Sequence, residues 1–90
     1  MEPDPHDKTR AELHILEAVA LALERREEVF SAIESAQTQD EARTAVAKLM
    51  GMDELQARAV LDMQARRWTQ GEQRKITDRI AVLRFELEPT

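Results

Sequence analysis

The chain has 90 residues, of which 42% are hydrophobic and 34% are charged, and 13 Lys and Arg against 18 Asp and Glu give a net charge of −5. It contains no cysteine and no tyrosine, which excludes disulfides, thiol nucleophiles, zinc–thiolate sites and tyrosine nucleophiles. The length predicts one small domain. The acidic balance argues against nucleic acid as the main partner.

No membrane association is expected, because no apolar run reaches the ~20 residues that cross a bilayer. The acidic start of the chain lacks the apolar core of a signal peptide, so we expect a cytoplasmic protein. Its Met1 is compatible with a free-standing small protein or with an excised fragment. Residues 1–8 are expected to form a disordered tail, and residues 9–88 a single helical domain.

Helix is the predicted structure throughout the domain, which is rich in Ala, Leu, Glu, Arg and Gln. Four possible helix starts pair a Ser, Thr or Asp with Glu or Gln three residues later, the pattern of a capping box. They are Thr9 with Glu12, Thr38 with Glu41, Asp53 with Gln56, and Thr69 with Glu72. With Gly51 as a stop signal, the pattern predicts helices over 9–36, 39–50, 54–67 and 70–88.

The order of helix lengths predicts the architecture. The first helix would span ~40 Å and the last ~28 Å, with two short helices between them. We expect an all-α fold of four helices: a long antiparallel helical hairpin, or coiled-coil arm, with a small two-helix globular tip. An ordinary four-helix bundle is the alternative.

The two long helices carry more apolar side chains than one facing helix can bury. On the last helix Ile76, Ile80, Leu83 and Leu87 form a seam for one facing helix, while Val82 and Phe85 lie on nearly the opposite side. The apolar arc of the first helix spans about 200°. One returning helix cannot cover it, so either the two short helices fold back or a second chain packs there.

The segment Gln56-Ala57-Arg58-Ala59-Val60-Leu61-Asp62-Met63 resembles the A subunit of bacterial type IIA topoisomerases, DNA gyrase and topoisomerase IV. Ten positions fall in register with the family pattern QAxAILDMRLxxLTxLExxKI: Gln56, Ala57, Ala59, Leu61, Asp62, Met63, Thr69, Glu72, Lys75 and Ile76. The stretches 11–17, 28–33, 40–43 and 49–52 extend the resemblance upstream. It covers about residues 9–88.

The resemblance implies the coiled-coil arm and globular tip of that subunit, where two tips meet across a two-fold axis as the exit gate, or C-gate. The family's catalytic tyrosine lies outside this region, so no enzymatic activity is expected. Three apolar positions of the pattern differ in size: its Leu residues are replaced by Ala65, Trp68 and Gly71.

Five apolar residues near the tip are the predicted dimer interface: Met50, Met52, Leu55, Met63 and Trp68. Met and Trp are common at interface cores, and Trp68 is the strongest candidate for an anchor. The alternative is that these residues only pack the short helices together.

The basic residues of the chain concentrate in one stretch, as a possible partner or DNA patch: Arg66, Arg67, Arg74, Lys75 and Arg79. We favour a solvated face that pairs with acidic residues of the first helix. No metal site and no cofactor are expected.

We therefore expect a non-catalytic homodimerisation module. A different possibility is a regulator or inhibitor that binds the gyrase or topoisomerase IV A subunit by imitating its exit gate. Direct DNA binding is the weakest alternative.

Overall fold

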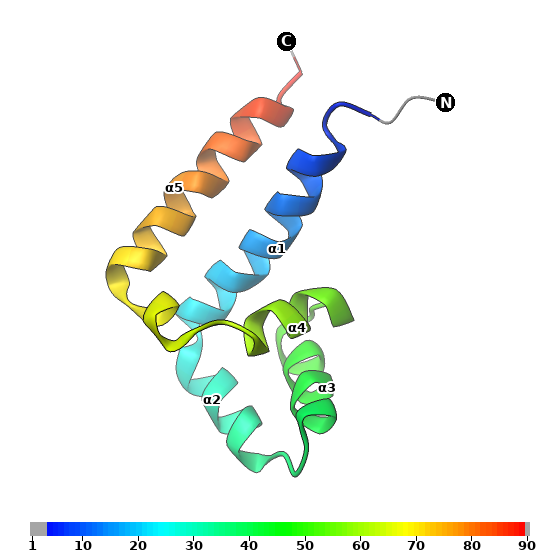
Figure 1. Ribbon diagram of the computed structural model, residues 1–90, viewed down its shortest axis with the longest axis vertical. Helices are drawn as coiled ribbons and strands as arrows, with labels where there is room; N and C mark the ends of the chain where they lie inside the picture. Colours follow the sequence, from blue (N-terminus) through cyan, green and yellow to red (C-terminus); the bar gives the residue numbers. More distant parts are fainter. Residues whose placement is uncertain (1–3, 90) are drawn as a thin grey trace.

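The computed structural model describes residues 4–89, and within that range the regular structure is helical (Figure 1). Five α-helices and one 3₁₀ helix follow in order: α1 (Asp7–Glu24), α2 (Arg26–Ser35), α3 (Gln39–Met50), α4 (Glu54–Leu61), η1 (Ala65–Trp68) and α5 (Gln70–Leu87). Residues 1–3 of the expected disordered tail 1–8 lie outside the described residues. The domain boundary at residue 9 stays a prediction.

The predicted single helix over 9–36 is wrong, because the chain bends at Arg25 and forms two helices. Arg25 has φ −114° and ψ 38°, outside helical values. Next to it, the Arg26 guanidinium donates to the Leu23 carbonyl at 3.1 Å and to the Trp68 carbonyl at 2.7 Å. This tertiary contact supports the bend, which the helix-forming residues around it do not suggest.

The predicted long hairpin is also wrong. The α1 and α5 helices have 18 residues each, so each is about 27 Å long. The helix expected over 54–67 ends at Leu61, and the chain then turns through Asp62 before η1. The described part of the chain therefore has five α-helices rather than four, and α1 and α5 form only a short antiparallel pair (Figure 1).

Three of the four predicted helix starts are confirmed. The Thr38 hydroxyl accepts from Glu41 N at 3.1 Å, the Thr69 hydroxyl accepts from Glu72 N at 3.3 Å, and Asp53 with Gln56 completes a capping box. The start at Thr9 is wrong, since α1 already begins at Asp7. Gly51 ends α3 with φ 66°, a left-handed conformation in which glycine is unstrained.

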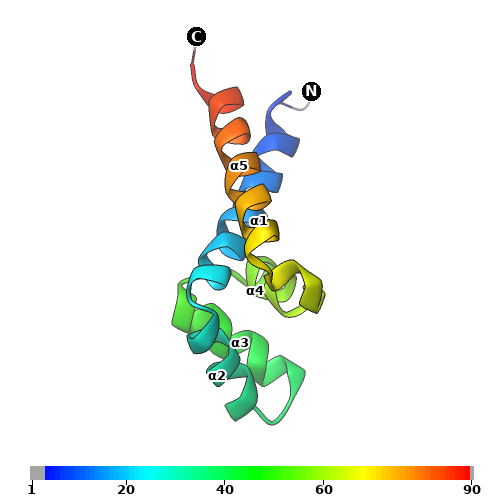
Figure 2. The ribbon, with the colours of Figure 1, turned by 90° about the vertical axis from the view of Figure 1, so that its left-hand side faces the viewer.

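The core consists of two clusters. Ala22, Val29, Val46, Met50, Ala57 and Val60 are the buried residues of the lower cluster, where α2, α3 and α4 pack below and beside α1. Val19, Leu23, Ile76 and Ile80 are those of the upper cluster, between α1 and α5. Trp68 is half-buried and packs against both. Figure 2 shows the two parts one above the other. The short helices thus fold back over the wide apolar arc.

The pairing of α1 with α5 follows the predicted seam. Ile76, Ile80 and Leu83 are buried, while Val82 and Phe85 on the other side of α5 are exposed. Two ion pairs join the helices beside the seam. Arg79 donates from Nε and Nη2 to the two carboxylate oxygens of Glu12, at 2.8 and 3.0 Å, and Arg84 Nη2 lies 3.5 Å from Glu17 Oε2. The Arg79 guanidinium also lowers the pKa of Glu12.

Arg26→Ala should destabilise the fold by about 1–3 kcal/mol, because it removes charged hydrogen bonds to two carbonyls at a part-buried position. Urea unfolding followed by fluorescence measures this, and Trp68 is the sole tryptophan, so its emission should also shift to the red. Arg25→Ala is the matched control. Its ion pair with Glu28 is exposed, so stability should hardly change. Equal effects of both changes would contradict the bridging role of Arg26.

Candidate protein interface

The five predicted interface residues do not form one exposed patch. Met50 is buried in the lower cluster, and Met52 packs partly buried against it. Met63 packs partly buried against the upper cluster. Leu55, in the first turn of α4, is 61% exposed. Of the five, Leu55 is therefore the residue that the fold itself leaves uncovered.

Trp68 stands at the junction of the two parts of the molecule. Its ring lies 4.8 Å from the ring of Phe30, at an interplanar angle of 51°, within the range of favourable aromatic pairs. The Arg26 guanidinium donates a hydrogen bond to the Trp68 backbone carbonyl. Sequence reasoning did not identify Phe30 or Arg26 as its partners. Phe30 and Arg26 lie 38 and 42 residues from Trp68 in the chain, so no local sequence pattern indicates that they contact it.

One surface combines apolar and charged groups of both signs, and we name it the α4 face. It consists of Leu55, Arg58 and Asp62, which are all exposed and spaced three and four residues apart, so that they share one side of α4. Within residues 4–89, neither Arg58 nor Asp62 makes an ion pair.

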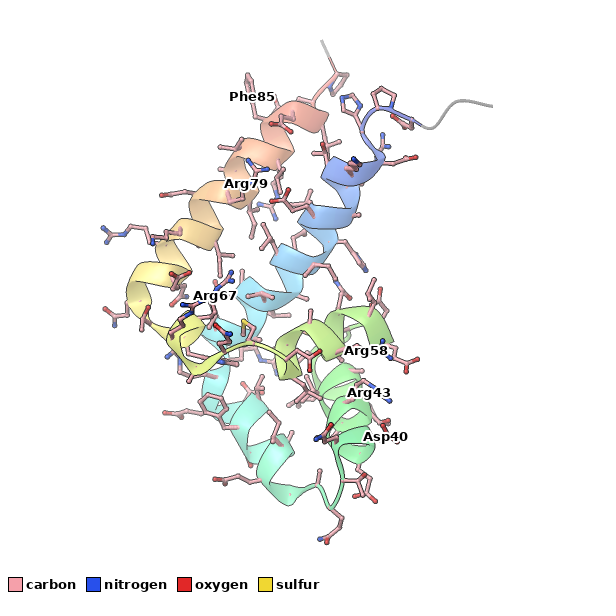
Figure 3. All side chains as sticks on the ribbon, in the orientation of Figure 1. Asp40, Arg43, Arg58, Arg67, Arg79 and Phe85 are labelled. Atoms are coloured by element: carbon pink, nitrogen blue, oxygen red, sulfur yellow. The ribbon has the colours of Figure 1, made fainter. Side chains whose placement is uncertain are left out.

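A groove of about 300 Å³ adjoins the α4 face, between α3 and α4. Its apolar lining comes from Ile33, Ala42 and Leu61, and its polar lining includes Arg43, Arg58 and Asp62. Arg43 is held by Asp40 at 2.9 Å and by Glu54 at 3.6 Å. Figure 3 shows Arg58, Arg43 and Asp40 following one another down the same side of the molecule.

The start of α4 is anchored to α1 by a polar network. Asp53 caps α4 and contacts the ring of His14, and the Gln56 side chain donates to the His14 carbonyl at 2.8 Å. Hydrogen bonds from Gln56 N and from His14 lower the pKa of Asp53 below its ordinary value of 3.8. The network fixes the position of α4, and with it the α4 face, relative to α1.

Asp53→Asn should destabilise the protein at neutral pH but not in strong acid. Asn still caps a helix, so the change removes mainly the charge. A lowered carboxylate pKa stabilises the fold above the unfolded value of 3.8, and this stabilisation is lost as the pH falls through the folded pKa. Thermal unfolding of both proteins between about pH 7 and pH 2 measures it. The difference should shrink as the pH falls below 3.8 and through the lowered folded-state pKa, and a constant difference would contradict this role of the charge.

Three of the five residues of the predicted basic stretch contact acidic groups of the chain itself. Lys75 lies 3.6 Å from Glu72, and Arg79 binds Glu12. Arg67 Nε lies 3.3 Å from Glu72 Oε2 without hydrogen-bond geometry, so the contact is ionic only. Arg66 and Arg74 are exposed and have no ion-pair partner within residues 4–89. The stretch is therefore partly neutralised.

A second exposed apolar position lies at the far end of α5. Phe85 is 74% exposed, Val82 is 47% exposed one turn before it, and Figure 3 shows Phe85 directed away from α1. Across residues 4–89, no group of three His, Asp or Glu side chains could hold a metal ion. None of the helices described is both long and apolar enough to span a bilayer.

Comparison with known proteins shows similarity to DNA gyrase A subunits. The chain is 39% identical over 80 residues to the DNA gyrase A subunits of Mycobacterium leprae, Mycolicibacterium smegmatis and Campylobacter jejuni. Each match covers 89% of this chain but only 6%, 10% and 9% of the respective gyrase protein. No established family profile matches the chain. The chain is therefore homologous to one short segment of the DNA gyrase A subunit.

Proposed function

We propose that this chain is a non-catalytic homodimerisation module that resembles the exit gate of the gyrase A subunit. The observation that carries the proposal is the identity of 39% over 80 residues with that protein, together with the exposed Leu55, which directly precedes the segment 56–63 where the resemblance is strongest. A large apolar side chain that is 61% exposed at the start of a short helix gains free energy when a partner covers it.

The absence of an enzymatic role rests on chemistry. The 90 residues contain no tyrosine and no cysteine. Ser31 and Ser35 lie on α2, where the Ser35 hydroxyl donates to the Ser31 carbonyl of the same helix. A serine nucleophile needs an adjacent general base. Association is therefore the function that this set of side chains supports best.

Leu55→Glu should shift the protein from dimer to monomer. Sedimentation equilibrium of the unchanged protein at micromolar concentration should give about twice the chain mass of 10.3 kDa. The variant should dissociate at least about tenfold more readily, because a charge replaces an apolar contact. Glutamate in the first turn of a helix is favourable, so the fold should be kept.

Val82→Glu is the matched control, since Val82 is 47% exposed on α5 and lies outside the lobe of α2, α3 and α4. It should leave the dimer unchanged. A monomeric unchanged protein at all attainable concentrations would refute homodimerisation. An equal loss of dimer in both variants would refute the assignment to Leu55.

A second candidate function is binding to the gyrase A subunit itself. It is favoured by the same identity, because a surface that pairs with its own copy can also pair with a homologous segment of similar sequence. Such a chain would occupy the place of one protomer in a gate and alter the activity of the assembled enzyme.

Added to DNA gyrase, the unchanged chain should bind the gyrase A subunit in a pull-down and change the rate of supercoiling, whereas Leu55→Glu should do neither. Both effects should grow with chain concentration, as expected for competition with a protomer of the gate. Binding by both proteins alike, or an unchanged rate with either, would contradict the regulator. Direct DNA binding has the least support, because Arg67, Lys75 and Arg79 already contact acidic side chains.

A further inference from the structure

We infer that two copies of this chain join through antiparallel packing of their α4 faces, with Arg58 of each copy paired to Asp62 of the other. This inference rests on the proposed homodimerisation and specifies which surface performs it. It replaces the cluster of Met and Trp residues, which are buried or half-buried in the core of the same chain, by a surface that is exposed.

The spacing along α4 is suited to a two-fold axis. Arg58 and Asp62 are four residues apart, about 6 Å along the helix. Antiparallel packing around an axis midway between them places each arginine opposite the partner's aspartate. A two-fold interface always makes such contacts in pairs, so one arginine and one aspartate per copy give two ion pairs.

Charge also favours a second copy over a purely acidic or purely basic partner. The groove beside α4 and its rim carry Arg43 and Arg58 together with Asp40, Glu54 and Asp62. A partner of one sign would meet like charges there, which is unfavourable. A second copy brings both signs in reversed order. The approach of Arg58 to the partner's α4 carboxyl end, which Asp62 caps, is favoured by the helix dipole as well.

The same arrangement partly covers Leu55. Leu55 lies near the amino end of α4, whereas Leu61 and Asp62 of the groove lie at its carboxyl end. Antiparallel packing about an axis midway between Arg58 and Asp62 brings these opposite ends together. Leu55 of one copy then lies just past the partner's Asp62, at the carboxyl end of the partner's α4. Part of the exposed leucine surface is thereby removed from water.

A reciprocal charge reversal tests the pairing. In Arg58→Glu, each new glutamate would face the partner's Asp62. In Asp62→Arg, each new arginine would face the partner's Arg58. Each variant alone should therefore dissociate at least about tenfold more readily than the unchanged chain. An equimolar mixture of the two should form heterodimers, because both contacts are then between opposite charges.

Native mass spectrometry distinguishes the heterodimer from either homodimer by mass. Circular dichroism checks that both variants stay helical, and the mixture itself requires folded proteins. If Arg58→Glu unfolds, the two single variants Arg58→Gln and Asp62→Asn are used in place of the charge reversals. Each of them should weaken the dimer. Arg74→Glu is the matched control for the charge change, since Arg74 is exposed on α5, and it should dimerise normally.

The outcomes separate this inference from the proposed function. Heterodimers from two weakly associating variants support the inference. If the unchanged chain is a dimer but the single variants dimerise equally well, or if mixing restores nothing, the pairing is overturned and homodimerisation stands. If the unchanged chain is monomeric, both are overturned.

Discussion

The bridge from Arg26 to the Leu23 and Trp68 carbonyls is the contact on which the arrangement of the helices depends. It lies at the bend between α1 and α2 and reaches the 3₁₀ turn that leads into α5. The bend directs α2 towards α3, and the same guanidinium positions Trp68 between the two core clusters. A part-buried guanidinium needs acceptors for its N–H groups, and here one acceptor lies at the bend between α1 and α2 and the other in the 3₁₀ turn. The bend and the turn therefore stabilise each other.

The bend also explains how so small a chain covers its apolar surface. A straight helix over 9–36 would present apolar side chains over an arc too wide for one neighbour. Once the helix is broken, Leu23 faces α5 in the upper cluster, while Ala22 and Val29 belong to the lower cluster with α3 and α4. The result is elongated, at 47 × 34 × 19 Å, and its Cα radius of gyration of 14.4 Å exceeds the ~12 Å of a compact chain of this length.

What could be predicted from the sequence was local. The caps at Thr38, Asp53 and Thr69 and the stop at Gly51 involve residues within five positions of one another, and the structure confirms them. The buried side of α5 could also be predicted, because its apolar residues recur every three or four positions along the helix. The bend at Arg25 could not be predicted, because arginine favours helix and the supporting acceptor lies 42 residues away. The predicted interface mixes core and surface residues for a related reason: both are apolar, and only the packing shows that Leu55 is exposed while Met50 is buried.

The two sides of α4 show how one short helix serves fold and surface together. Ala57 and Val60 point into the lower cluster, and the network of Asp53, Gln56 and His14 fixes the start of the helix against α1. An eight-residue helix is not stable by itself, so these contacts are what hold it in place. Its outer residues are thereby presented on a rigid support, which lowers the conformational entropy lost on association. A partner that binds this side of α4 therefore meets side chains whose backbone is already ordered by the core.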